Sequence, residues 1–440
     1  MPHAAYIAWG FPPSRSGGAY RQLATANALA AAGWEVSVLT VERSVFTGIT
    51  GADLSLESQI DPRLRLIRTR FPWPLRNPDR ATWSLAHRLA PRVWRKARAL
   101  AELAVFPEVG YAGWLGELRR ALRALHRQRP VDLVVASANP YVAFAAAYFC
   151  HRRWGLPFVM DYRDAWSLDV FSGEAAFGRA GRRARLERRY LAAGAQAWFV
   201  NQPIKQWYAE RYPEAAARFR VVANGWDPEL LGARAGAPSG GGRPLAFGYL
   251  GTVSGKVPLG ELLAGWRLAR RSGALGPDAT LKVAGYLGFF GSGEDRAGQD
   301  AAAQLAQAAA DGVAFAGPVA KAQVAEFYAG LDGLVLALGP GRYVTSGKVY
   351  EYMATGKPIV SVHPPESAAC AVLEGYPLWA RAAALTPEAV AAALGQAARL
   401  AANLTPAQAA QARAHGARFT RQRQLGPALA QLPALLARTS

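Results

Sequence analysis

Residues 334–362 read LVLALGPGRYVTSGKVYEYMATGKPIVSV. Two apolar runs in this stretch, Leu334–Leu338 and Ile359–Val362, have the length of buried strands. Between them, Ser346–Thr355 has the length and the composition of a helix. The order strand, helix, strand predicts a βαβ unit, in which the two strands run parallel.

The same alternation extends along the whole chain. Other short apolar runs predict strands at Ala5–Trp9, Val36–Thr40, Leu133–Ser137, Phe158–Asp161, Ala197–Asn201, Arg220–Ala223, Ala246–Leu250, Leu281–Ala284 and Val313–Ala316. Helix-length stretches lie between strands at Gly18–Ala32, Tyr141–Trp154, Leu259–Arg271 and Lys321–Ala329. Continuous apolar strands that alternate with helices indicate parallel sheets covered by helices on both faces.

One segment divides this pattern almost in half. Gly232–Pro244, GARAGAPSGGGRP, is too rich in Gly, Pro and Ser to hold a helix or a strand. We therefore expect an α/β protein with two Rossmann-like, doubly wound parallel-sheet domains that face a cleft. The tail Pro387–Arg438 is rich in Ala, Gln and Leu, which predicts helices, and we expect its last part to cross back onto the first domain.

The composition excludes several classes of protein. The 440 residues are 51% hydrophobic and 10% aromatic, which argues against a disordered chain. The cysteines, Cys150 and Cys370, belong to no CxxC or Cys/His cluster, so neither a disulfide framework nor a zinc site is supported and the expected location is the cytoplasm. We expect no signal peptide and no membrane span, because the N-terminus lacks a basic region and no apolar run is long enough.

The charge is strongly basic and is concentrated in one segment. The formal net charge is +20, which indicates an anionic partner. Arg63–Arg129 alone holds sixteen Arg or Lys and four acidic residues, with apolar residues at helical spacing between the basic ones. This amphipathic pattern predicts either a helix on anionic lipid, peripheral on the inner face of the membrane, or an ordinary surface helix packed on its own domain.

Ligands of open parallel sheets bind beyond the carboxyl ends of the strands, so we looked for candidate residues in the loops there. After the first strand, Gly17 and Gly18 lie in a glycine-rich turn ahead of a helix, where backbone N–H groups can hold an anion. An ordinary turn is the alternative, and no GxGxxG fingerprint of nicotinamide cofactors is present. Asp161, Arg163 and Asp164 end another strand and must either face the cleft or form an internal ion pair.

Two loops of the second half combine glycine turns with cations. Gly251 and Lys256 follow the strand Ala246–Leu250. In the other loop, Lys348 lies in the first turn of the predicted helix, where the helix dipole disfavours a cation unless an anion is also bound. Glu351 lies three residues later, on the same helix face, and could accept hydrogen bonds from ribose hydroxyls. A solvated Lys/Glu pair is the alternative.

Three motifs together resemble the GT-B glycosyltransferases of family 4. They are a GGxxR sequence ending at Arg21, an NG-aromatic-D sequence at 224–227, and SGKVYEYMATGKPIV at 346–360. The resemblance extends from Tyr6 to about Leu373. It implies metal-independent transfer of a sugar, without a cofactor, from a nucleotide donor to an acceptor hydroxyl, with retention of the anomeric configuration.

The resemblance also assigns roles to domains and residues. Residues 1–232 would bind the acceptor, residues 244–425 would bind the nucleotide sugar, and residues 426–440 would form the returning helix. The implied donor site consists of Gly251, Lys256, Arg342, Ser346, Gly347, Lys348 and Glu351. The implied loop for phosphate or acceptor consists of Gly17, Gly18 and Arg21, and the implied acceptor or catalytic residues are Asp161, Arg163 and Asp164.

The sequence departs from the family pattern at one important position. Many members carry an E-x7-E pair, but the residue eight before Glu351 is Tyr343. This departure leaves a non-catalytic partner protein as an alternative. A nucleotide-sugar epimerase is another alternative, because the same fold hosts such enzymes. Expected partners are a UDP-, GDP- or dTDP-sugar, a saccharide or lipid-linked acceptor, and an anionic membrane surface. Nucleic acid is not expected, because no zinc finger, RNP or helix-turn-helix signature is present.

Overall fold

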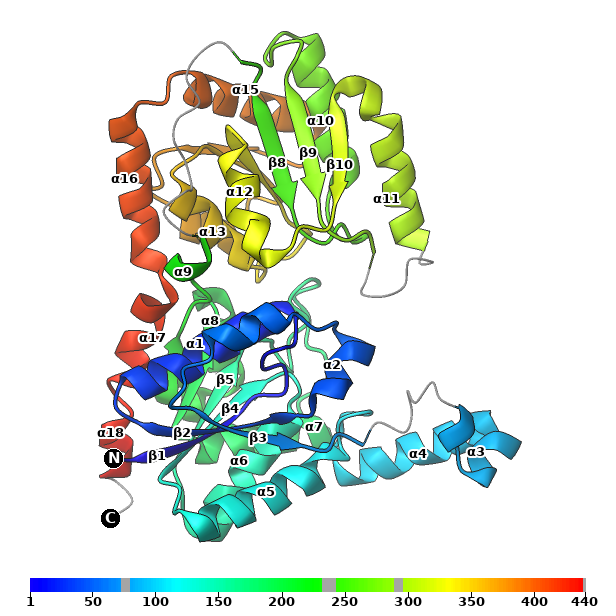
Figure 1. The fold of residues 1–440 in the computed structure, drawn as a ribbon, viewed down its shortest axis with the longest axis vertical. Coiled ribbons are helices and arrows are strands. Elements are labelled where there is room, and N and C mark those ends of the chain that lie inside the picture. Colours follow the sequence, from blue (N-terminus) through cyan, green and yellow to red (C-terminus); the bar gives the residue numbers. More distant parts are fainter. Residues whose placement is uncertain (73–79, 232–242, 289–295, 438–440) are drawn as a thin grey trace. The chain divides into compact units, whose positions relative to one another are not determined.

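The computed structural model describes residues 1–72, 80–231, 243–288 and 296–437, so most of the predicted linker Gly232–Pro244 lies outside the described residues. The chain forms two compact units, each built on its own parallel sheet (Figure 1). The first unit comprises Met1–Asp169, Glu174–Ala223 and Leu425–Ser440. The second comprises Val170–Gly173 and Asn224–Gln424.

The first unit contains a seven-stranded sheet with the order β3-β2-β1-β4-β5-β6-β7 in the described residues. Its strands are β1 (His3–Ile7), β2 (Glu35–Val41), β3 (Arg65–Thr69), β4 (Leu133–Ala138), β5 (Phe158–Tyr162), β6 (Gln196–Phe199) and β7 (Phe219–Val221). Its helices are α1 (Gly17–Ala31), α2 (Arg43–Ile49), α3 (Leu85–Leu89), α4 (Pro91–Val105), α5 (Trp114–Gln128), α6 (Val142–Trp154), α7 (Arg182–Ala193), α8 (Gln202–Arg211) and, at the end of the chain, α18 (Pro433–Leu436).

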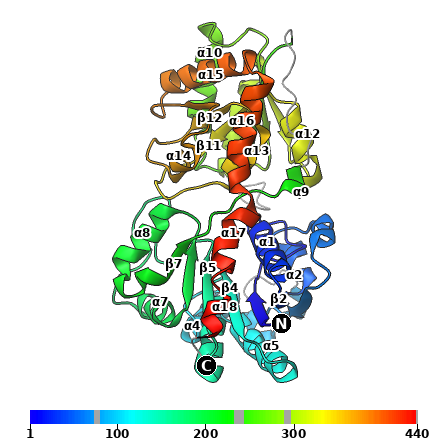
Figure 2. The ribbon, with the colours of Figure 1, turned by 90° about the vertical axis from the view of Figure 1, so that its left-hand side faces the viewer.

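Helices cover both faces of this sheet, which explains why its central strands are buried along almost their whole length. On one face, a single buried cluster contains Leu29 of α1, Trp198 of β6, and Leu429 and Leu432 near the C-terminus. Figure 2 shows this C-terminal segment, in red, lying against the first unit. The other face is covered by α5, α6 and α7, with α6 in contact with β4 and β5.

The second unit contains a six-stranded sheet with the order β10-β9-β8-β11-β12-β13 in the part of the chain that is described. Its strands are β8 (Ala246–Leu250), β9 (Thr280–Ala284), β10 (Val313–Gly317), β11 (Gly333–Ala337), β12 (Ile359–Val362) and β13 (Trp379–Arg381). Its helices are α9 (Pro228–Leu231), α10 (Leu259–Arg271), α11 (Arg296–Gln307), α12 (Val324–Ala329), α13 (Gly347–Thr355), α14 (Ala368–Leu373), α15 (Pro387–Ala402), α16 (Pro406–Gly416) and the start of α17 (Arg421–Leu429).

The core of the second unit lies between its sheet, α10 and α15. The ring of Trp266 in α10 is fully buried and contacts Phe247 of β8 at a centroid distance of 6.0 Å. On the opposite side, α13 packs against β11 and against α16. This places the N-terminus of α13 just beyond the carboxyl end of β11, where the sequence predicts a ligand.

The predicted fold class, two doubly wound parallel sheets, is confirmed. Two edge strands, β3 and β13, are missing from the prediction. The sequence of β3 is RLIRT, in which Arg65 and Arg68 interrupt the apolar run, and β13 has only three residues. Among the described residues, no helix is long and apolar enough to cross a membrane.

Candidate functional site

The candidate residues of each unit lie where the strand order of its sheet reverses. In the first sheet the reversal falls between β1 and β4, and in the second it falls between β8 and β11. Ligands of doubly wound folds bind beyond the carboxyl ends of the strands at such a reversal. The glycine turn after β1 and the loops after β8 and β11 are therefore correctly placed for binding.

In the first unit, the N-terminus of α1 is the predicted anion-binding loop. Ser16 caps α1 without a side-chain hydrogen bond to the helix, which leaves backbone N–H groups of the first turn available. A Cβ atom at Gly18 would lie 2.6 Å from Nη1 of Arg163, so the Arg163 guanidinium packs directly against the backbone of α1 here. A Cβ atom at Gly17 would meet no atom within 4 Å, so Gly17 is open to a ligand.

Arg21 and Asp161 form a buried ion pair beneath this loop. Nη2 and Nε of Arg21 donate to the Asp161 carboxylate at 2.6 and 3.0 Å, and Nη1 donates to the Val222 carbonyl at 2.8 Å. The two side chains are 3% and 0% exposed. The resemblance implies that both residues contact substrate or phosphate, and the sequence left an internal ion pair open for Asp161. In the structure they form a buried ion pair that links α1 to β5.

Arg163 and Asp164 are the members of this cluster that reach the surface. They pair with each other, which is the structural alternative, and their side chains remain 25% and 44% exposed. The Nε atom of Arg163 is buried and has no hydrogen-bond partner among the described residues. Arg163 therefore keeps a donor free beside the N-terminus of α1.

Glu108 is a buried titratable group that no sequence motif indicates. Its carboxylate accepts hydrogen bonds from the backbone N–H groups of Tyr141 and Val142 at 3.1 and 2.9 Å, at the start of α6. Burial raises the pKa of Glu108 to about 7 against the effect of these two hydrogen bonds. The Tyr141 ring in turn stacks on Trp166 at a centroid distance of 5.0 Å, two residues beyond Asp164.

In the second unit, α13 begins as predicted. The hydroxyl of Ser346 accepts a hydrogen bond from the Lys348 N–H at 3.2 Å and caps the helix, and Gly347 is the first helical residue. Lys348 is in the first turn with 31% of its side chain exposed. Burial lowers the pKa of Lys348 in spite of the neighbouring Glu351.

Glu351 lies at the centre of a charged cluster. Its Oε1 accepts from Nζ of Lys321 at 2.8 Å, its Oε2 accepts from the Tyr328 hydroxyl at 2.9 Å, and Nζ of Lys348 lies 4.0 Å from Oε2. Burial alone would raise the pKa of Glu351, but Lys321 and Lys348 together lower it to about 2. Lys321 could not be predicted as a site residue, because nothing in the sequence shows which cation pairs with a glutamate 30 residues away.

The loop after β8 places Lys256 on an aromatic surface. Nζ of Lys256 lies 3.3 Å from the centroid of the Phe171 ring, a cation–π contact. The backbone of Lys256 packs closely on the loop after β11, because a Cβ atom at Gly339 would lie 2.4 Å from its carbonyl oxygen. Gly251 begins the same β8 loop and donates its N–H to the Ala284 carbonyl at 2.9 Å.

At the loop after β11, Arg342 is exposed and Tyr343 is buried. The guanidinium of Arg342 lies 4.8 Å from the centroid of the Tyr343 ring. A buried aromatic ring thus occupies the position at which many family members place the first glutamate. Among the described residues, no group of three or more His, Cys, Asp or Glu side chains is arranged to hold a metal ion.

Parts of two motifs prove to have structural roles. Nζ of Lys357, in the sequence GKP, donates to the carbonyl oxygens of Tyr328 and Ala329 at 2.7 and 2.9 Å and so caps the end of α12. In the sequence NGWD, Nε of Arg421 donates to Asp227 at 2.6 Å and its Nη1 donates to the Asn224 carbonyl at 2.6 Å. This motif binds the C-terminal part of the chain.

Comparison with known proteins agrees with this geometry. Residues 16–225 match a glycosyl transferase 4-like domain, and residues 259–402 match the glycosyl transferases group 1. No curated protein sequence matches the chain.

Solved structures share the complete fold at low sequence identity. A sucrose-phosphate synthase from Thermosynechococcus elongatus has a TM-score of 0.61 and 17% identity, over 100% of this chain and 98% of that chain. A glycosyltransferase from Rickettsia africae has a TM-score of 0.66 and 11% identity, over 99% and 98%. HepE from Anabaena, in complex with UDP and glucose, has a TM-score of 0.62 and 15% identity, over 99% and 100%.

The matched domains account for most of both units, and the two parallel sheets are those of the similar structures. The chain belongs to the family-4-like glycosyltransferases of the GT-B fold.

Proposed function

We propose that the protein transfers a sugar from a nucleoside diphosphate sugar to a hydroxyl of a saccharide or lipid-linked acceptor. The transfer retains the anomeric configuration and needs no metal ion. The second unit binds the donor, and the first unit binds the acceptor. The HepE structure, a complex with UDP and glucose, supports a nucleotide-sugar donor for this fold.

The charge balance around α13 is the observation that carries the proposal. Lys321 already neutralises Glu351 at 2.8 Å, whereas Lys348 lies 4.0 Å from the same carboxylate. Two lysines and the positive end of a helix thus face one carboxylate, which leaves the site electropositive. A diphosphate supplies the missing negative charge, and Lys348 is exposed enough to reach it.

This arrangement also explains how the leaving group is stabilised. Negative charge develops on the diphosphate as the bond to the sugar breaks, and the fixed N–H groups of α13 with Lys348 are already oriented to stabilise it. Glu351 is held by Tyr328 and Lys321, so its remaining lone pairs can accept from ribose hydroxyls. The leaving phosphate then accepts the proton of the incoming hydroxyl on the same face of the sugar.

On the acceptor side, Asp164 and Arg163 are the exposed charged residues at the end of β5. Arg163 lies beside the N-terminus of α1, where an anionic group of the acceptor or donor would be favoured. Asp164 orients the acceptor hydroxyl. Asp161 and Arg21 support this surface from below.

Thermal stabilisation by UDP, GDP, dTDP and ADP, measured in the presence of EDTA, tests the donor site. We expect one nucleotide to stabilise the protein by about 2.7 kcal/mol when its concentration is about 100 times its dissociation constant. Lys348→Ala and Glu351→Ala should lose this shift. Lys282→Ala is the matched control, because Lys282 is an exposed lysine of β9. The donor site is refuted if no nucleotide stabilises the wild type.

Asp164→Asn tests the acceptor side. We expect this variant to bind nucleotide like the wild type and to lose sugar transfer. Proton NMR of the wild-type product gives its anomeric configuration and so tests retention. Loss of nucleotide binding as well would remove Asp164 from the acceptor site. A changed sugar after incubation with donor alone would identify an epimerase instead.

We also propose that α3 and α4 lie on an anionic membrane, where a lipid-linked acceptor would be found. Large apolar side chains on this segment are 59 to 77% exposed. They are Leu85, Leu89, Val93, Leu100 and Val105. Arg88, Arg92, Arg95, Lys96 and Arg98 lie among them, and the combination of exposed apolar and basic residues suits an interfacial helix. Figure 1 shows α3 and α4 at the periphery of the first unit.

Sedimentation with vesicles tests this surface. The wild type should sediment with phosphatidylglycerol vesicles at low salt, and Leu89→Glu combined with Val93→Glu should abolish sedimentation. Leu54→Glu is the control, because Leu54 is 68% exposed outside the segment. Equal sedimentation of both variants would contradict the proposed surface.

A further inference from the structure

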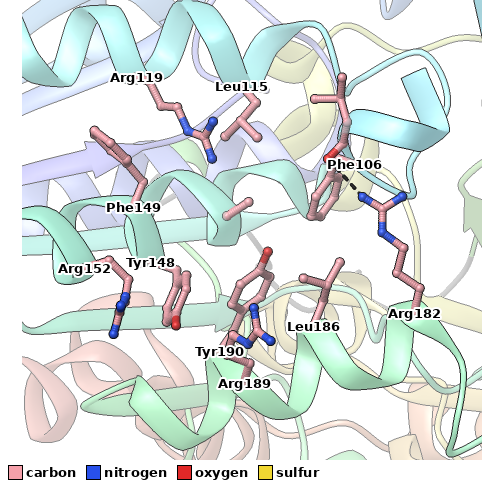
Figure 3. Close-up of a pocket in the computed structure, with 12 residues that line it drawn as sticks. Phe106, Leu115, Arg119, Tyr148, Phe149, Arg152, Arg182, Leu186, Arg189 and Tyr190 are labelled. Atoms are coloured by element: carbon pink, nitrogen blue, oxygen red, sulfur yellow. Dashed lines mark hydrogen bonds between the residues drawn. The ribbon is translucent and has the colours of Figure 1, made fainter. Parts of the chain in front are cut away.

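A cavity of about 280 Å³ lies among the helices on one face of the first unit. Figure 3 shows it between α5 and α7, with side chains of α6 along one side. Its described lining residues are Val105, Phe106, Leu115, Arg119, Ala145, Tyr148, Phe149, Arg152, Arg182, Leu186, Arg189 and Tyr190. Four are arginines and none is acidic. The cavity is lined by helices and does not include the loops that form the candidate site.

Three of the arginines are available to a ligand. In the described part of the chain, Arg119, Arg152 and Arg189 form no ion pair. The buried Nε atom of Arg119 has no hydrogen-bond partner there either. Arg182 is already engaged, because its Nη2 donates to the carbonyl oxygen of Ala104 at 2.8 Å.

The position of Arg119 is held by packing. Its guanidinium lies 5.4 Å from the centroid of the Phe149 ring, and the guanidinium of Arg123 lies 4.8 Å from the same ring. In Figure 3, Arg119 points into the space between the helices from α5, and the Tyr190 hydroxyl points into it from α7. Burial raises the pKa of Tyr190 to about 12, so this hydroxyl stays protonated and can donate.

The remaining walls are apolar or aromatic. Phe106 and Leu115 are 2% and 3% exposed and line the cavity together with Leu186. At its edge, Val105 is 59% exposed and is the last of the exposed apolar residues of α4. Val105 therefore belongs both to the cavity lining and to the exposed apolar residues of α4.

From this combination we propose that the cavity binds a phosphate-bearing amphiphile of net negative charge. The phosphate ester is held by Arg119, Arg152 and Arg189, because guanidinium groups match phosphate oxygens in pairs of hydrogen bonds. The first carbons of the hydrocarbon chain lie on Phe106 and Leu186. A cavity of about 280 Å³ has room for such a headgroup and not for a whole lipid, so the rest of the chain leaves beside α4.

The cavity is also linked to the segment after β5 that contains Asp164. The Phe106 ring stacks on Trp166 at a centroid distance of 5.6 Å, and Trp166 follows Asp164 by two residues. The ligand can be a bilayer phospholipid or the phosphate of a lipid-linked acceptor, which share this chemistry. The inference does not depend on the proposed transfer reaction.

Isothermal titration of the full chain with soluble short-chain ligands tests the proposal. The ligands are dihexanoyl phosphatidylglycerol, farnesyl phosphate, dihexanoyl phosphatidylcholine and inorganic phosphate, the lipids below their micelle concentrations. Arg119→Gln combined with Arg189→Gln removes two of the three arginines. The matched control is Arg120→Gln combined with Arg185→Gln, which removes the same charge from α5 and α7 at exposed positions outside the lining.

We expect at least one of the two anionic amphiphiles to bind the wild type and the control alike. The cavity variant should bind it about a hundredfold more weakly, about tenfold for each lost charge-assisted contact. Tighter binding of phosphatidylglycerol indicates a bilayer lipid, and tighter binding of farnesyl phosphate indicates an acceptor carrier. The proposal is overturned if neither binds, if phosphatidylcholine or inorganic phosphate binds equally well, or if cavity variant and control lose affinity equally. Nucleotide stabilisation of the cavity variant, measured in parallel, reports separately on the donor site.

Discussion

Glu351 makes the stability of the second unit depend on pH. Its pKa in the folded protein, about 2, lies below its ordinary value of 4.5, so folding favours the ionised form. This contribution to the free energy of unfolding is complete above pH 4.5 and is lost as the pH falls toward 2, with a maximum of about 3 kcal/mol. Glu351→Gln should therefore lose most stability at neutral pH, and its difference from the wild type should shrink in acid, as measured by urea unfolding at pH 6 and pH 3.

Glu388→Gln is the control for this experiment, because Glu388 is exposed on α15. Its difference from the wild type should be small at both pH values. A Glu351→Gln difference that is the same at pH 6 and pH 3 would show that Lys321 and Lys348 do not stabilise the carboxylate.

The buried pair of Arg21 and Asp161 predicts a different kind of defect. Asp161→Asn leaves a buried guanidinium without its counter-charge, and we expect the free energy of unfolding to fall by about 3–5 kcal/mol. Asp164→Asn, at a side chain 44% exposed, should change it by less than about 1 kcal/mol. Urea unfolding of the two variants separates a supporting residue from a surface residue. Equal stability of the variants would contradict this division.

The sequence showed which residue types gather at the ends of the strands, but not which of them pair. Lys348, Ser346 and Gly347 could be placed because their roles depend on the local geometry of a helix start. The partners of Glu351 and Asp161 could not, because Lys321 and Arg21 approach them only after the sheets have formed. For Asp161 the sequence left an internal ion pair open, but it did not indicate Arg21 as the partner.

At the scale of elements, the N-terminus of α6 should respond to pH in the opposite direction to Glu351. The pKa of Glu108 is raised from 4.5 to about 7, so folding favours its protonated form. The free energy of unfolding should fall as the pH rises from 4.5 to 7, by at most about 3 kcal/mol. Glu108→Gln should remove this slope, and its stability relative to the wild type should increase between pH 5 and pH 8 in urea unfolding.

Glu117→Gln is the control for this variant, because Glu117 on α5 pairs with the exposed Arg120. Its stability relative to the wild type should not change over the same range. A parallel pH dependence of the wild type and Glu108→Gln would show that Glu108 is ionised throughout.

The sequence predicted the buried strands well and the edge strands poorly. Strands such as β4 and β12 are continuous apolar runs because both faces are covered. β3 and β13 lie at the edges, where partial exposure permits charged side chains and short lengths. For α4, the amphipathic pattern is visible in the sequence, but only the structure shows that its apolar side chains remain exposed.

At the scale of the whole molecule, the end of the chain completes the core of the first unit. Leu429 and Leu432 are 6% and 0% exposed in the cluster that also contains Leu29. Leu432→Ala should lower the free energy of unfolding by about 2–5 kcal/mol, as much as the same substitution at a core residue of α1. Leu29→Ala is the matched comparison and Leu54→Ala the exposed control in the same urea experiment. A Leu432→Ala variant as stable as Leu54→Ala would show that the C-terminal segment is not part of the core.

The composition of the C-terminal tail predicts helices, but it does not show that the tail packs on the first unit. Helices could be predicted for the tail from its Ala, Gln and Leu content. The contacts that direct it, between Arg421 and Asp227 and between Trp226 and the Phe419 carbonyl, join residues about 190 apart in the sequence. No local pattern reports such contacts.

The packing of the tail on the first unit has a consequence for the order of events during synthesis. The strand β1 is synthesised before the second unit, but the core around it lacks Leu429 and Leu432 until the second unit has been made. The core of the first unit therefore stays incomplete while the second unit is synthesised. A chain truncated after Gln424 would keep the residues of the second unit but would lack a segment of the first. Part of the apolar core of the first unit is therefore exposed in the nascent chain. We expect chaperones that bind apolar surface on the ribosome to bind the first unit at this stage.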